Sequence, residues 1–114
     1  MQHPTDAQAQ FNLGCRYASG DGVPKDPTQA VEWYRKAAGQ GHADAQFNLG
    51  VCYENGDGVD KDMNEAVRLY KLAAAQGFGS AIEALDELEA DGKEKEEEET
   101  FVFVNGLGDL DLDD

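Results

Sequence analysis

The chain has 114 residues, which is enough for one small domain with a thin hydrophobic core. Its net charge of −15 argues against nucleic-acid and anionic-membrane partners, because both require clustered Lys and Arg. No segment is long and apolar enough to cross a bilayer. The first ten residues lack the features of a secretory signal, and two cysteines are too few for a disulfide framework. Both observations predict a cytoplasmic or nuclear protein with reduced thiols.

The negative charge is concentrated near the C-terminus. Residues 1–90 contain 14 acidic and 7 basic side chains, whereas residues 91–114 contain 10 acidic side chains and only two lysines. A segment this rich in charge cannot bury an apolar face. The distribution therefore predicts a folded domain over residues 1–91 and an acidic tail over residues 92–114.

The sequence repeats itself with a period of 36 residues. Residues 7–41 align without gaps to residues 43–77, and about 21 of the 35 aligned positions are identical. Repeats of this length are typical of helical-repeat proteins, whose units bury their apolar faces by stacking on one another. We therefore expect two full units with the same fold.

The first half of each unit predicts a helix. Ala9, Leu13 and Tyr17 are spaced four residues apart, share one helical face and recur 36 residues later. Gly14 and Gly50 lie inside these helices, where glycine costs about 1 kcal/mol relative to alanine. Because the cost is repeated, we expect a neighbouring helix to pack too closely there for a Cβ atom.

The second half of each unit predicts another helix with a defined start. The first helix ends at Gly20 or Gly56, and a Gly-Asp-Gly-Val turn follows. Asp26 and Asp62 then occupy N-cap positions, where a side-chain oxygen accepts hydrogen bonds from free backbone amides. Alanines and a tyrosine form the inward stripe of this helix in both units: Ala30, Tyr34, Ala37 and Ala38, then Ala66, Tyr70, Ala73 and Ala74.

A third, partial unit follows the second. Ala81 and Leu85 keep the register of the first helices, although Asp86 stands at the glycine position. The segment SAIEALDELEADG predicts one amphipathic helix with Ile82, Leu85 and Leu88 turned inward. A terminal helix with a polar outer face is how a stack of repeats usually ends. The predicted architecture is five helices in a short right-turning stack.

The recurring pattern Ala-x-x-x-Leu-Gly-x-x-Tyr, then Gly-x-Gly-Val, Asp, Ala, Tyr and Ala-Ala-x-x-Gly, resembles the Sel1-like repeat family, a relative of tetratricopeptide repeats. The resemblance covers residues 7–77 and part of residues 79–91. It implies an all-α fold: a short right-handed α-solenoid of antiparallel helix pairs, with two full Sel1-like repeats, a terminal capping helix and the acidic tail. It also implies a non-enzymatic adaptor or scaffold that binds a protein or peptide partner in a concave groove lined by the first helices.

The likeness to tetratricopeptide units assigns groove positions to the first helices. They are Gln8, Phe11, Asn12 and Cys15 in the first unit, and Asp44, Phe47, Asn48 and Val51 in the second. Some tetratricopeptide proteins clamp a C-terminal carboxylate with Lys, Arg and Asn at such positions. Phe, Cys and Val favour a partly apolar peptide instead. Packing between helices is the alternative role for Phe11 and Phe47, and the sequence leaves both roles open.

Catalytic and cofactor motifs do not occur in the sequence. The two histidines are His3, near the N-terminus, and His42, which is expected to begin a helix. There is no Cys-x-x-Cys pair, zinc-ligand cluster, nucleophile elbow or phosphate-binding loop, so we expect no enzyme activity, cofactor or metal site. Some relatives of the family are linked to β-lactam binding, but they are cysteine-rich, whereas Cys15 and Cys52 are not even at equivalent positions. A small enzyme or ligand-binding protein, or a structural piece of a larger solenoid, is the alternative function.

The acidic tail is interrupted by the apolar run Phe-Val-Phe-Val. Phe101 and Val104, preceded by acidic residues, resemble the motif that binds ubiquitin-like autophagy modifiers. That motif adds a strand to a sheet edge and places two side chains in pockets, and phosphorylation of Thr100 would add charge to it. Two alternatives remain: a solvated tail without a partner, or a tail that lies in the chain's own groove near Phe11 and Phe47.

Overall fold

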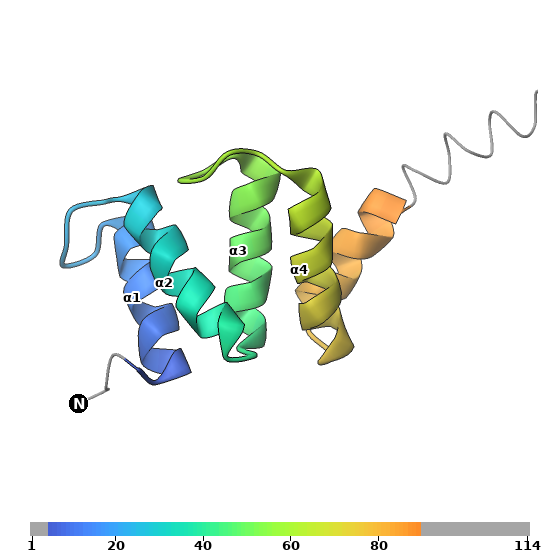
Figure 1. The fold of residues 1–114 in the computed structure, drawn as a ribbon, viewed down its shortest axis with the longest axis horizontal. Helices are drawn as coiled ribbons and strands as arrows, with labels where there is room; N and C mark the ends of the chain where they lie inside the picture. The colour runs from blue at the N-terminus through green and yellow to red at the C-terminus, as the bar shows by residue number, and fades with distance from the viewer. Residues whose placement is uncertain (1–4, 90–114) are drawn as a thin grey trace, which may run out of the picture.

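The computed structural model describes residues 5–89, and this part of the chain consists of five helices without a strand (Figure 1). Four of them have 13 residues each: α1 (Ala7–Ser19), α2 (Pro27–Gly39), α3 (Ala43–Asn55) and α4 (Met63–Ala75). A fifth helix occupies residues 79–89. Helix α1 packs against α2 and α3 packs against α4, while α2 and α3 make a smaller contact that joins the two pairs. The short right-handed solenoid of antiparallel helix pairs that the sequence predicts is therefore confirmed.

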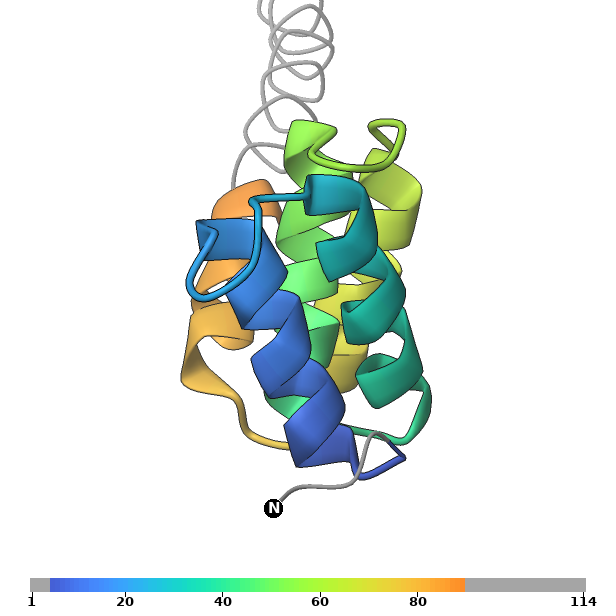
Figure 2. The same ribbon diagram turned by 90° about the vertical axis from the view of Figure 1, so that its left-hand side faces the viewer.

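The helices divide into two layers (Figure 2). Helices α2 and α4 lie on one side of the stack, α1 and the helix of residues 79–89 lie on the other, and α3 runs between them. We call the surface formed by α2 and α4 the second-helix face. The surface formed by α1, α3 and residues 79–89 is the first-helix face.

Capping residues fix the helix boundaries where the sequence predicts them. Asp26 and Asp62 each accept a hydrogen bond from the backbone amide three residues later, at 3.2 and 3.1 Å. Gly20 and Gly56 end α1 and α3 with left-handed φ angles of 79° and 71°. His42 caps α3, because its Nδ1 accepts a hydrogen bond from the backbone amide three residues later at 3.2 Å.

The glycines inside α1 and α3 allow close helix contact. A Cβ atom at Gly14 would lie 2.6 Å from the ring of Tyr34, and one at Gly50 would lie 2.7 Å from the ring of Tyr70. Each would also lie 3.3 Å from a backbone carbonyl oxygen of the next helix. The tyrosine rings thus occupy the space that a side chain would need, which confirms the predicted close approach.

The turn of the second unit lies against the start of α2. Gly58 has a φ angle of 77°, and a Cβ atom there would overlap the carbonyl group of Pro27. Gly22 is its equivalent in the first unit and has a φ angle of 78°, but a Cβ atom there would meet no atom within 4 Å. Both positions require a left-handed backbone, and only Gly58 also requires the absence of a side chain.

The fifth helix packs differently from the prediction at one residue. Ala81 is fully buried, Leu85 and Leu88 pack against the core, and Ile82 is 41% exposed. The prediction that Ile82 faces inward was therefore wrong. Ala81 keeps the register of the earlier units, and steps of four and three residues lead from it to Leu85 and Leu88. Ile82 points about 100° away from that face.

Candidate functional site

The eight predicted groove residues lie along one side of α1 and the equivalent side of α3. Their spacing of three and four residues aligns the side chains on each helix. Gln8 and Asp44 are exposed, and the other six residues are half-buried. The structure therefore places all eight at the surface of the two helices.

Aromatic neighbours hold the two phenylalanines of this surface. The ring of Phe11 lies 5.8 Å from that of Tyr34 and 4.9 Å from that of His42, centroid to centroid. Phe47 repeats this arrangement one unit later, with centroid distances of 5.5 and 5.4 Å to the equivalent residues. Tilted rings at these separations attract one another. Both phenylalanines thus pack between helices and still keep part of their surface exposed.

Hydrogen bonds orient the polar residues at the start of the same surface. The side-chain oxygen of Gln8 lies 3.0 Å from Nε2 of His42, and its amide nitrogen donates to Oδ1 of Asn12 at 3.0 Å. These contacts connect the first turn of α1 to the N-cap of α3. The polar edge of the surface is therefore held in place before any partner binds.

The buried tyrosines keep their protons. Burial raises the pKa of Tyr34, and the neighbouring Cys15, whose Sγ accepts a hydrogen bond from the hydroxyl at 3.8 Å, raises it further. Burial likewise raises the pKa of Tyr70, which donates a hydrogen bond of 2.5 Å to the carboxylate of Glu54. Both phenols are neutral hydrogen-bond donors at neutral pH, and neither is placed as a base.

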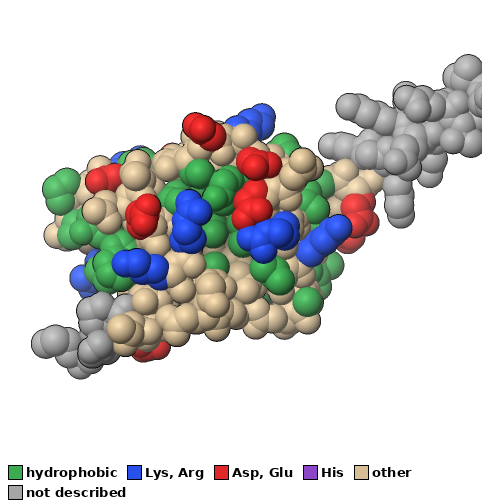
Figure 3. Space-filling model, viewed as in Figure 1, with side chains coloured by type: hydrophobic (Ala, Val, Ile, Leu, Met, Phe, Trp, Pro, Cys, Tyr) green, Lys and Arg blue, Asp and Glu red, His purple; other side chains and the backbone are tan. Residues whose placement is uncertain are grey.

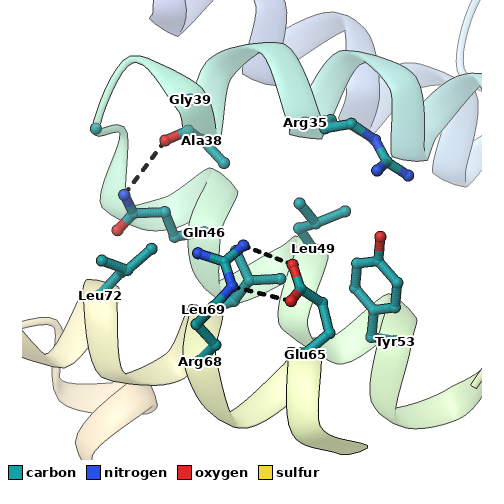
Figure 4. Close-up of a pocket in the computed structure, with 11 residues that line it drawn as sticks. Arg35, Ala38, Gly39, Gln46, Leu49, Tyr53, Glu65, Arg68, Leu69 and Leu72 are labelled. Carbon is teal, nitrogen blue, oxygen red and sulfur yellow. Dashed lines mark hydrogen bonds and ion pairs between the residues drawn. The ribbon is translucent and has the colours of Figure 1, made fainter. Parts of the chain in front are cut away.

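A groove of about 400 Å³ opens on the second-helix face (Figure 4). Helix α3 forms its floor with Leu49 and Tyr53, while α2 and α4 form its sides. Arg35 of α2 lies with its guanidinium carbon 6.0 Å from the ring centre of Tyr53. Arg68 of α4 donates two hydrogen bonds to the carboxylate of Glu65. The groove therefore has an apolar floor and a guanidinium group on each side.

The helices of the two faces differ in net charge. Helices α1 and α3 and residues 79–89 carry six acidic side chains and one basic one, a net charge of −5. Helices α2 and α4 carry two acidic side chains and four basic ones, a net charge of +2. Figure 3 shows Lys and Arg on the second-helix face, interspersed with Asp and Glu. The four basic residues are Arg35, Lys36, Arg68 and Lys71.

This second surface is not evident from the order of charges along the chain, because basic and acidic residues alternate over a few positions. The basic residues of α2 and α4 could have been found by assigning each charge to its helix and then comparing alternate helices. The groove itself had no sequence signal, because it depends on the distance between α2 and α4 above α3.

Metal-binding clusters are absent from residues 5–89. No three His, Cys, Asp or Glu side chains in that part of the chain come together as metal ligands. None of its helices is long and apolar enough to span a bilayer. Cys15 and Cys52 are half-buried and not joined. Burial, with the charge of Asp57, raises the pKa of the Cys52 thiol to about 11, so it is protonated and weakly nucleophilic at neutral pH.

The predicted tail motif lies outside the described residues. This holds for Thr100, Phe101 and Val104, and for the acidic segment of residues 92–114 as a whole. Its role as a recruitment motif therefore stays a prediction.

Stacked antiparallel helix pairs with two exposed faces are the architecture of a helical-repeat protein. The Sel1 repeat matches the sequence twice, at residues 7–42 and 43–78, which together cover more than half of the chain. The chain belongs to the Sel1 repeat family. Sel1 repeats generally bind other proteins, and the fold is of a scaffold type rather than a catalytic one.

Three solved structures share this fold. A Sel1 repeat protein from Oxalobacter formigenes is 44% identical with a TM-score of 0.76, and the match covers 77% of this chain and 36% of that one. The protective antigen c5321 of uropathogenic Escherichia coli is 51% identical with a TM-score of 0.65, over 66% of this chain and 16% of that one. Cysteine-rich protein B of Helicobacter pylori is 31% identical with a TM-score of 0.66, and the match covers 68% of this chain and 59% of that one. The chain thus spans less than two-thirds of each relative, and no curated protein matches it.

Proposed function

We propose that this protein is a non-enzymatic adaptor that binds a protein or peptide partner on its first-helix face. The observation that carries the proposal is the repeated pair Phe11 and Phe47, which are half-exposed and fixed by ring contacts in equivalent positions. A side chain that is already ordered loses little conformational freedom on binding. We place the adaptor in the cytoplasm or nucleus, where Cys15 and Cys52 would stay reduced.

The surroundings of the two phenylalanines indicate which partner would fit. Asn12 and Asn48 are half-buried beside them and carry amide groups suited to hydrogen bonds with a peptide backbone. Asp44 is exposed at the start of α3, on a face with a net charge of −5. A partner segment with apolar residues and basic flanks would match both properties, because complementary charge speeds association and selects partners.

A random peptide library displayed on phage and selected against the full chain tests this proposal. We expect enriched peptides to combine apolar and basic residues, and Asp44→Lys to weaken their binding about threefold to tenfold. Glu32→Lys is the matched control, because it makes the same charge change at an exposed position of α2. The proposal is wrong if Glu32→Lys weakens the selected peptides and Asp44→Lys does not.

A ubiquitin-like autophagy modifier is a further partner that the sequence predicts for the tail. Neither membership of the Sel1 repeat family nor the three related structures support it. The prediction can be tested with a purified modifier, since Phe101→Ala or Val104→Ala should each weaken binding more than about tenfold. Equal binding by the variants and the unmodified chain would contradict it.

A further inference from the structure

The groove on the second-helix face has the dimensions of a binding site and a lining that is apolar in part. Its volume of about 400 Å³ lies within the range of roughly 300–1,000 Å³ that is usual for ligand sites. Leu72 on the α4 side is 42% exposed, and Tyr53 on the floor is half-buried. An occupant with an aromatic or aliphatic side chain would cover both.

The rim of this groove is suited to carboxylates. Arg68 is 58% exposed and uses two of its five N–H donors on Glu65, so the others are available to a ligand. Arg35 is exposed on the opposite side, so two guanidinium groups lie at the groove with one carboxylate, that of Glu65. Guanidinium groups bind carboxylates through paired hydrogen bonds. The groove therefore favours an acidic segment that contains an apolar anchor.

We propose that the occupant of this groove is the chain's own acidic tail, residues 92–114. Residues 91–114 contain 10 acidic side chains and the apolar run Phe-Val-Phe-Val, so they have both properties that the groove requires. The charge of the tail also favours docking on the second-helix face over the first-helix face. The second-helix face, at net +2, attracts this tail, whereas the first-helix face, at net −5, repels it.

The linker is long enough for the tail to reach the groove. The helix of residues 79–89 packs on α4, which is one side of the groove. Phe101 follows residue 89 by 12 positions, and an extended chain of that length spans roughly 40 Å. A 13-residue helix is only about 20 Å long. Attachment to the same chain gives an effective concentration in the millimolar range, so weak contacts are enough to hold the tail.

This arrangement differs from the tail position considered from the sequence. There the tail would lie near Phe11 and Phe47, on the face with the same sign of charge. Docking on the second-helix face leaves that first-helix surface open to a partner. The inference is therefore independent of the function proposed above.

Backbone amide NMR spectra of the full chain test the inference. We expect replacement of the four residues Glu96 to Glu99 by Gln to shift the amide signals of the groove, with Leu72 and Tyr53 as the reporters. Raising the salt concentration from about 0.05 to about 0.5 M should move the same signals in the same direction, because salt screens the attraction. Phe101→Ala should reduce the ratio of docked to free tail more than about tenfold.

Charge reversal on the folded part gives the matched control. Arg35→Glu, which reverses a charge at the groove, should release the tail. Arg16→Glu makes the same charge change on the first-helix face and should not release it. Both residues are exposed, so helical circular dichroism should be unchanged. The inference is overturned if the tail variants shift no groove signal, or shift signals near Phe11 instead. Shifts that grow with protein concentration would assign the groove to the tail of a second copy and would also overturn it.

Discussion

Replacing Gly58 by alanine should destabilise the protein more than the same change at Gly22. The two glycines have φ angles of 77° and 78°, so a left-handed alanine costs about 1–2 kcal/mol at either position. Only at Gly58 would the new Cβ overlap the carbonyl group of Pro27 in the preceding unit. Relieving this overlap requires the two units to shift, and overpacking of this kind costs about 1–3 kcal/mol more. The cost of the left-handed backbone is common to both variants. The difference between their free energies of unfolding therefore measures the overlap with Pro27 alone.

Urea unfolding followed by the helical circular dichroism signal provides the measurement. The free energy of unfolding of Gly58→Ala should lie about 1–3 kcal/mol below that of Gly22→Ala. In a domain of this size each 1 kcal/mol lowers the melting temperature by roughly 4–8 °C, so thermal unfolding should give the same order. Equal stability of the two variants, within about 0.5 kcal/mol, would show that the turn relaxes freely, and the argument from the Pro27 contact would fail.

Three further perturbations test the core, the caps and the buried phenols. Leu49→Ala should lower the free energy of unfolding by about 2–5 kcal/mol, because Leu49 is buried. Leu13→Ala, at the half-buried equivalent position, should lower it by less, and equal losses in urea unfolding would contradict this. Asp62→Ala should cost about 0.5–2 kcal/mol as an N-cap, and a change near zero in the same assay would exclude the capping role. Burial raises the pKa of Tyr70, so its contribution to stability is complete below the unfolded pKa of about 10 and is lost as pH rises above it. The urea concentration at the unfolding midpoint should decrease as pH rises above about 10, and the decrease should be smaller for Tyr70→Phe. A midpoint that does not change with pH in the unmodified protein would refute the linkage.

Local signals explain why most of the fold could be predicted. The N-caps Asp26 and Asp62 and the helix-ending Gly20 and Gly56 act on the residues beside them, so their meaning can be deduced without knowing the tertiary structure. Ile82 shows the limit of this approach. Two neighbouring apolar residues can each belong to an inward stripe, and only the register set by the preceding units selects Ala81.

The candidate surfaces depended more on contacts between distant residues. The sequence assigned positions such as Phe11 and Phe47 to the first helices, but it could not separate partner contact from packing between helices. The structure shows the ring contacts that orient both side chains. The second-helix groove arises where α2 and α4 stand apart above α3, a distance that no local pattern encodes. Arg35 and Arg68 lie in different units and come to the same groove only when the helices stack.

The fit of the buried tyrosines against the glycines of α1 and α3 links two positions that are 20 residues apart. Enlarging Gly14 or Gly50 requires a smaller side chain at Tyr34 or Tyr70, so each pair should vary together among related repeats. A repeat transplanted into another solenoid should therefore be moved with both members of its pair.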